Sequence, residues 1–74
     1  MNNKVDLTIG LPVYNEEEKI NKVLQDIFSQ DYKKFRLIIS DNASKDKTYE
    51  ICKKWLKKKK NIKLIRQKKK IEHK

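Results

Sequence analysis

This 74-residue chain contains one glycine, one proline and one cysteine. The dinucleotide-binding turn and the phosphate-binding loop both need several glycines, because their backbone must approach a phosphate closely. The lone glycine, Gly10, lies within an apolar stretch, so both motifs are excluded. A nucleotide site in this chain therefore has to be built from side chains.

The single cysteine, Cys52, cannot form an intrachain disulfide. The sequence has no secretory leader and no apolar run near the roughly 18 residues of a membrane span. These absences predict a reducing, cytoplasmic setting. Cys52 falls among apolar positions of a predicted helix, and we interpret it as a small buried side chain rather than a reactive thiol.

The net charge of +10 is confined to the last third of the chain. Residues 1–51 hold eight Lys or Arg against nine Asp or Glu, whereas residues 52–74 hold twelve against one. The lysine runs thus favour two generic partners, nucleic acid and the acidic lipids at the inner face of a membrane. The first two-thirds of the chain is electrically ordinary.

Apolar periodicity predicts the first strand and the first helix. Residues 5–11 alternate and then become apolar, as in a buried strand, which should end before Pro12 because proline cannot donate to a sheet. Asn15 is the predicted N-cap of a helix that runs to Gln30, with Glu18 completing a capping box. The helix carries one apolar stripe, formed by Ile20, Val23, Leu24, Ile27 and Phe28.

The same pattern then recurs. Residues 35–40 predict a second strand, 41–46 a loop, and the following residues a helix capped by Ser44 or Asp46. Residues 61–66 predict a third strand, and 67–74 a loose basic tail. The order β-α-β-α-β predicts an α/β fold with parallel strands and right-handed crossovers. Apolar positions of the second helix recur at helical spacing at Ile51, Cys52, Trp55 and Leu56.

Polar residues follow the first two predicted strands, at an edge of the sheet where nucleotides bind. Tyr14 offers a flat ring and a hydroxyl, Asp41 accepts hydrogen bonds, and Asn42 both donates and accepts. Taken singly, each is better explained as a turn or loop residue, and residues 16–18 as a helix start. Their placement at the ends of neighbouring strands is what indicates a site.

The stretch from Leu11 to Glu17, followed by that from Ser40 to Thr48, resembles the start of a family 2 glycosyltransferase with the GT-A fold. That family shows a Pro-Val-Tyr-Asn-Glu corner and an Asp-Asp-Gly-Ser-Thr-Asp-Gly-Thr corner at this separation. The resemblance covers residues 5–66. It implies a Rossmann-like, three-layer arrangement of which residues 1–66 are the N-terminal, nucleotide-binding half.

The resemblance also implies an enzyme that transfers a sugar from a nucleotide-sugar donor to an acceptor. By position, the residues that would hold the nucleoside are Pro12, Tyr14, Glu16, Asp41 and Asn42. Asn42 replaces the second aspartate of the family's pattern, so specificity for uracil does not carry over. Ala43 and Lys47 stand where the family usually has glycines, which indicates a different path of this loop.

Family members need Mg²⁺ or Mn²⁺, held in part by an Asp-x-Asp motif, and a catalytic carboxylate further along the chain. No Asp-x-Asp occurs in this sequence, and Glu72 is the only carboxylate after Arg66. Sugar transfer requires both a stabilised diphosphate leaving group and a base. We therefore expect these residues to bind a donor without turning it over, and to leave the first strand as an apolar, self-associating edge.

Two rival functions remain open from the sequence. A nucleic-acid-binding module would use Lys57–Lys60 and Lys68–Lys70, with Trp55 nearby. A response-regulator-like domain would use Asp41 to hold magnesium, but the paired acid that it needs after the first strand is absent. His73 is interpreted as an exposed tail residue.

Overall fold

The computed structural model describes residues 7–68. Its elements are β1 (Leu7–Val13), α1 (Ile20–Phe28), β2 (Phe35–Asp41), α2 (Thr48–Lys58) and β3 (Ile62–Arg66). This order confirms the predicted β-α-β-α-β unit and its α/β class. No helix within the described residues is long and apolar enough to cross a membrane.

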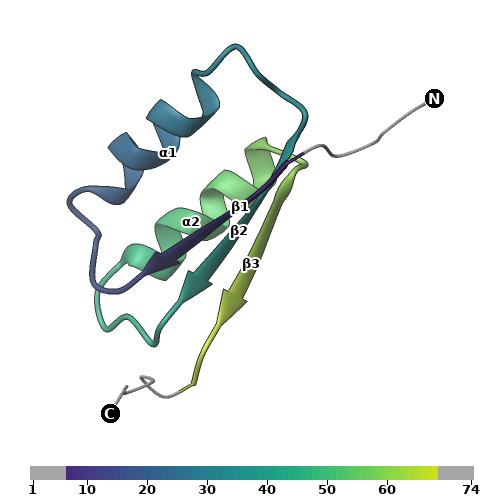
Figure 1. Ribbon diagram of the computed structural model, residues 1–74. Coiled ribbons are helices and arrows are strands. Elements are labelled where there is room, and N and C mark those ends of the chain that lie inside the picture. The colour runs from purple at the N-terminus through teal and green to yellow at the C-terminus, as the bar shows by residue number, and fades with distance from the viewer. Residues whose placement is uncertain (1–6, 69–74) are drawn as a thin grey trace.

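The three strands form one parallel sheet in the order β1-β2-β3. The register pairs Val13 with Asp41, and Asp41 with Arg66. All three carboxyl ends therefore lie at the same end of the molecule, where the strand arrows point in Figure 1. The corners that carry the predicted site residues follow directly from β1 and β2.

One face of the sheet is covered by both helices. Right-handed crossovers in this strand order place α1 and α2 on the same side, and Phe35, Leu37 and Ile39 of β2 are buried beneath them. The helices touch through Phe28 and Trp55, whose rings stack with centroids 5.8 Å apart. Two of the three layers of the predicted arrangement thus lie within the described residues.

Trp55 belongs to this core, as its place on the apolar stripe predicts. Its side chain is 9% exposed, and its Nε1–H donates to Asn21 Oδ1 over 2.9 Å. A buried indole is not a surface on which a nucleic-acid base can stack. The lysines of α2, by contrast, lie mostly on the exposed side of the helix.

The prediction that the first strand ends before Pro12 was wrong, because β1 continues through Pro12 to Val13. Among the described residues β1 is an edge strand, and proline is tolerated there because the missing N–H removes no bond to a second neighbour. Leu7 at its start is 49% exposed. Residues 5 and 6 of the predicted strand lie outside the described residues.

The predicted cap of the first helix was also wrong. The helix begins at Ile20, its N-cap position is Lys19, and no side chain caps it, so the capping box with Glu18 is not formed. Asn15 instead has a left-handed backbone with φ of 50°. The helix ends at Phe28, two residues before the predicted Gln30.

The remaining boundaries differ by one residue. Strand β2 extends to Asp41, and β3 begins at Ile62. The backbone N–H of Gln67 donates to the carbonyl of Asp41 over 2.9 Å, so contact with the sheet extends into the predicted tail. The tail residues 69–74, with His73, lie outside the described residues.

Cys52 is fully buried in the core, as predicted. Burial, together with the negative charge of Asp41, raises the pKa of the Cys52 thiol from 9.0 to about 11. The native state therefore favours the neutral thiol. The resulting stabilisation is complete below the unfolded pKa of 9.0 and is lost as the pH rises toward 11.

We predict that the free energy of unfolding falls by about 1 kcal/mol more between pH 8 and pH 10 in the natural chain than in the Cys52→Ala variant. Urea titrations of both proteins at the two pH values measure this difference. The comparison removes the contributions of lysines and tyrosines, which both proteins share. Parallel pH dependences would show that the thiol titrates normally in the native chain.

Candidate functional site

The sheet register brings the two predicted corners together. The backbone N–H of Asn42 donates to the carbonyl of Val13 over 2.9 Å, which extends the pairing of β1 and β2 by one residue. Tyr14 and Asn42, the residues that directly follow this pair, therefore lie side by side at the carboxyl edge. Both are partly buried, and Pro12 is exposed two residues earlier on β1.

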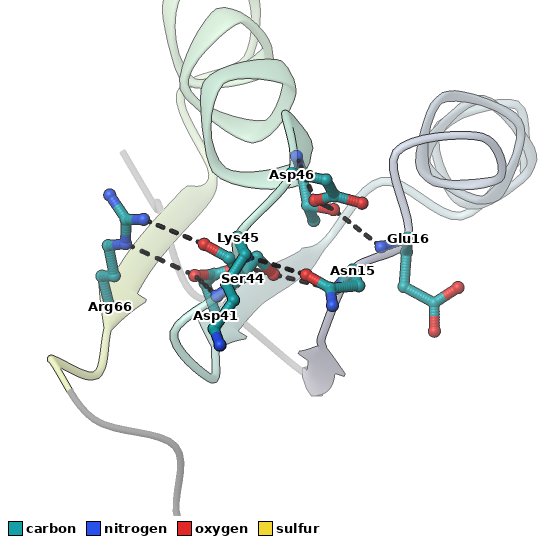
Figure 2. A network of polar contacts seen from close by, with 8 residues as sticks. Asn15, Glu16, Asp41, Ser44, Lys45, Asp46 and Arg66 are labelled. Carbon is teal, nitrogen blue, oxygen red and sulfur yellow. Dashed lines mark hydrogen bonds and ion pairs between the residues drawn. The ribbon is translucent and has the colours of Figure 1, made fainter.

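The corners are also joined through Asn15. Its backbone N–H donates to Ser44 Oγ over 2.9 Å, and its Oδ1 accepts from the N–H of Lys45 over 2.8 Å (Figure 2). The side-chain oxygen predicted to cap α1 thus binds the backbone of the other corner. Its left-handed backbone is one that asparagine adopts more readily than most residues.

A second set of bonds lies beside the first. Glu17 donates from its N–H to Asp46 Oδ2 over 3.2 Å and accepts at Oε1 from the N–H of Lys47 over 2.8 Å. The N–H of Glu16 donates to Thr48 Oγ1 over 2.7 Å. Five hydrogen bonds in total therefore join two loops that are about 30 residues apart in the sequence.

Asp41 is fully buried and faces into its own loop. Its carboxylate accepts from both the N–H and the hydroxyl of Ser44 and lies 3.5 Å from Nε of Arg66. Arg66 also donates to the carbonyl of Ser44 over 3.2 Å and stacks on Tyr49, with 4.3 Å between Cζ and the ring centroid. Figure 2 shows Arg66 reaching from β3 to this loop. Asp41 is thus positioned to order the loop that carries Asn42.

The loop takes an unusual path at Ala43, where φ is 60°. A left-handed backbone favours glycine, since a Cβ atom crowds the carbonyl there. The structure therefore explains why a glycine is usual at this position of the resembled pattern. Lys47, at the other such position, has an ordinary φ of −86°.

Asp46 supports the start of α2, as one of the two predicted caps. Its Oδ1 accepts from the N–H and the hydroxyl of Thr48, although the formal N-cap position is Lys47. Ser44, the other predicted cap, binds Asp41 instead. Desolvation acts to raise the pKa of Asp46, but the bonds donated by Thr48 and Glu17 outweigh it and hold this pKa below 3.8.

Glu16 is the corner carboxylate that points away from this network in Figure 2. It lines a hollow of about 370 Å³ beside the start of α1, and also a smaller one of about 130 Å³ between β1 and α1, which Pro12 shares. Tyr14, Asp41 and Asn42 line neither hollow. The larger hollow is lined by Asn15, Glu16, Glu17, Glu18, Lys19 and Asp46.

The corner carboxylates do not form a metal site. No group of three His, Cys, Asp or Glu side chains in the described part of the chain is arranged to hold an ion. Asp41 and Asp46 already accept bonds from neighbouring N–H and hydroxyl groups, and a cation would have to displace these donors. Both carboxylates are thus committed to ordering their own loop.

Ser44, Thr48 and Arg66 organise the site although the sequence analysis assigned none of them to it. The short spacing between Asp41 and Ser44 is typical of a local turn in which a side chain binds the backbone. This spacing is the signal in the sequence that could have assigned Ser44 to the site. Arg66 gave none, because its partners lie far away in the sequence, and the same holds for the bond between Thr48 and Glu16.

We predict that Ser44→Ala lowers the free energy of unfolding by about 1–3 kcal/mol, because it leaves the Asn15 N–H and a buried oxygen of Asp41 without a partner. Urea denaturation measures the effect. Ser40→Ala, four residues earlier on β2, is the matched control and should change stability by less than about 0.5 kcal/mol. Equal losses in the two variants would contradict the linking role of Ser44.

Two curated relatives match most of this chain. A dolichyl N-acetyl-alpha-D-glucosaminyl phosphate 3-beta-D-2,3-diacetamido-2,3-dideoxy-beta-D-glucuronosyltransferase of Methanococcus voltae is 40% identical over 62 residues, which are 81% of this chain and 19% of that protein. Glycosyltransferase AglE of Haloferax volcanii is 42% identical over 48 residues, or 62% and 16%. The chain thus spans less than a fifth of the length of these relatives.

Solved structures show the same fold. A mannosyltransferase of Pyrobaculum calidifontis in complex with GDP-Man and Mn²⁺ superposes with a TM-score of 0.82 at 26% identity, over 95% of this chain and 21% of that one. S. aureus TarS in complex with UDP gives 0.78 at 29% identity, over 86% and 19%. These matches confirm the predicted GT-A architecture.

The sequence profile of glycosyl transferase family 2 matches residues 8–71, which include both corners and all of the three strands except Leu7. This match extends over most of the chain and confirms the resemblance drawn from the two corner motifs. The chain belongs to glycosyl transferase family 2.

Proposed function

We propose that this chain forms the nucleoside-binding part of a glycosyltransferase that moves a sugar from a nucleotide-sugar donor to an acceptor. The observation that carries the proposal is the bond from the Asn42 N–H to the Val13 carbonyl, which aligns Tyr14 with Asn42 at one edge. The GDP-Man and UDP in the complexes of the two similar structures support a donor of this class.

Each proposed residue has a distinct role. The Tyr14 ring packs against the base or ribose, and the Asn42 amide bonds the base, since it both donates and accepts. Exposed Pro12 adds apolar contact beside them, and Glu16, whose carboxylate points outward, accepts from donor hydroxyls. Asp41 acts as a positioning residue, because its carboxylate already binds Ser44 and Arg66.

We predict that Tyr14→Ala weakens the binding of a nucleoside diphosphate at least fivefold, since stacking of a base on an aromatic ring contributes about 1–3 kcal/mol. Titration calorimetry with UDP and GDP measures the change without assuming which base is preferred. Tyr32→Ala, which removes an exposed tyrosine beyond the far end of the sheet, is the matched control and should bind normally. Equal affinity in all three proteins would place the nucleoside elsewhere.

Sugar transfer itself requires groups that these residues do not supply. The sequence contains no Asp-x-Asp, and the buried Asp41 is committed to its own loop. The curated relatives are several times longer than this chain. We propose that the metal ligands and the catalytic base belong to the portion of such enzymes that this chain does not match.

We predict that the 74-residue chain neither hydrolyses nor transfers a bound nucleotide-sugar, even with Mg²⁺ or Mn²⁺ present. Chromatographic detection of released UDP or GDP, with UDP-sugars and GDP-sugars as donors, tests this. Donor binding is measured on the same preparation, so that misfolding is distinguished from inactivity. Metal-dependent release above the protein-free rate would refute the prediction.

A further inference from the structure

We call the carboxyl edge of the sheet, where Tyr14 and Asn42 lie, the donor edge. The opposite end of the molecule carries a dense positive charge. Two segments meet there, residues 29–34 between α1 and β2 and residues 57–61 at the end of α2, and we call them the basic end. Figure 1 shows both at the amino ends of the strands. They contain six lysines, Lys33, Lys34, Lys57, Lys58, Lys59 and Lys60, against one carboxylate, that of Asp31.

Contacts with the core hold several of these lysines together. Lys33 Nζ donates to the carbonyl of Phe28 over 2.8 Å, and Lys59 Nζ lies 5.3 Å from the centroid of the Phe28 ring. Lys58 Nζ lies 5.5 Å from the centroid of Trp55, which stacks on Phe28. The two segments, far apart in the sequence, thus present their charges as one surface.

Apolar side chains are exposed at the same end. Tyr32, in the first segment beside Lys33 and Lys34, is 47% exposed. Leu7 is 49% exposed at the start of β1, where it pairs with Phe35 directly after that segment. An aromatic side chain flanked by lysines is typical of a surface that rests in the headgroup region of a bilayer.

We propose that the basic end docks on a lipid bilayer that contains anionic headgroups. The lysines bind lipid phosphates and carboxylates, while Tyr32 and Leu7 enter the interface. Seven-residue β2 separates the two ends of the sheet by about 20 Å. The donor edge therefore faces away from the lipid at roughly this height.

The exposed side chains favour lipid over nucleic acid. Single-strand binding uses successive aromatic rings as stacking platforms, but at this end of the described chain only Tyr32 is exposed, because Phe28 and Trp55 pack against the core with lysine side chains over them. The basic end contains no arginine, whose planar fork matches the edge of guanine bidentately. An aliphatic side chain such as Leu7 contributes to a lipid interface and little to a phosphate backbone.

The test is sedimentation of the full 74-residue chain with vesicles of phosphatidylcholine and phosphatidylserine in a 70:30 ratio, at 0.15 M salt. The triple variant K57Q/K58Q/K60Q should partition about a hundredfold less, because each lysine near an anionic surface contributes about fivefold. Glutamine preserves helix propensity at the end of α2. Tyr32→Ser should lower partitioning severalfold without changing its salt dependence.

The matched control is K19Q/K45Q/K47Q, which removes the same charge near the donor edge. These lysines lie farther from the docked surface than the screening length of about 8 Å, so partitioning should stay within about twofold. Circular dichroism verifies that each variant is folded. If a variant fails to fold, release of the unmodified chain at 0.5 M salt still tests the proposal.

Three results would overturn the proposal: equal partitioning onto pure phosphatidylcholine, equal losses in the two triple variants, or no release at high salt. A duplex or single-stranded oligonucleotide that displaces the chain from vesicles at equal phosphate concentration would assign the basic end to nucleic acid instead.

Discussion

Two hydroxyl groups, those of Ser44 and Thr48, determine the arrangement of the site. Each donates to a carboxylate of its own loop, Asp41 or Asp46, and accepts from a backbone N–H of the other corner. A hydroxyl suits this role because it donates and accepts at once. Without the Ser44 hydroxyl, the buried Asp41 Oδ1 and the Asn15 N–H would both lose their partner, at a cost that a chain of this size tolerates poorly.

This constraint divides the two corner motifs into residues that bind each other and residues that face outward. Asn15, Glu17 and Asp46 use their side chains on backbone N–H groups across the gap. Glu16 points away from this network in Figure 2, and the partly buried Tyr14 and Asn42 follow directly from β1 and β2 beside it. Many residues of the two corner motifs therefore fix the distance between two strand ends. The other motif residues depend on these bonds for their position.

The sequence predicted the elements well because their signal is local. The apolar stripe of α1 and the short apolar run of β2 each show within a few residues, and the structure buries Leu24, Leu37 and Ile39 accordingly. The cap of α1 was missed for the opposite reason. The side-chain oxygen of an asparagine that precedes a helix can accept a hydrogen bond from the helix or from a distant backbone N–H. Nothing near Asn15 in the sequence reveals that the donor is the N–H of Lys45, 30 residues away. Arg66 was missed in the same way.

Charge is distributed differently at the two ends of the sheet. Three glutamates precede α1, and Asp46 precedes α2, where the positive ends of the helix dipoles favour them. Lys57 and Lys58 lie in the last turn of α2, where the dipole favours cations. The donor edge is therefore less basic than the opposite end, because its glutamates and aspartates offset Lys19, Lys45, Lys47 and Arg66. Because Asp41 and Asp46 are committed to the loop, the proposed function assigns the nucleoside to this edge and leaves the phosphates to a cation held by other residues.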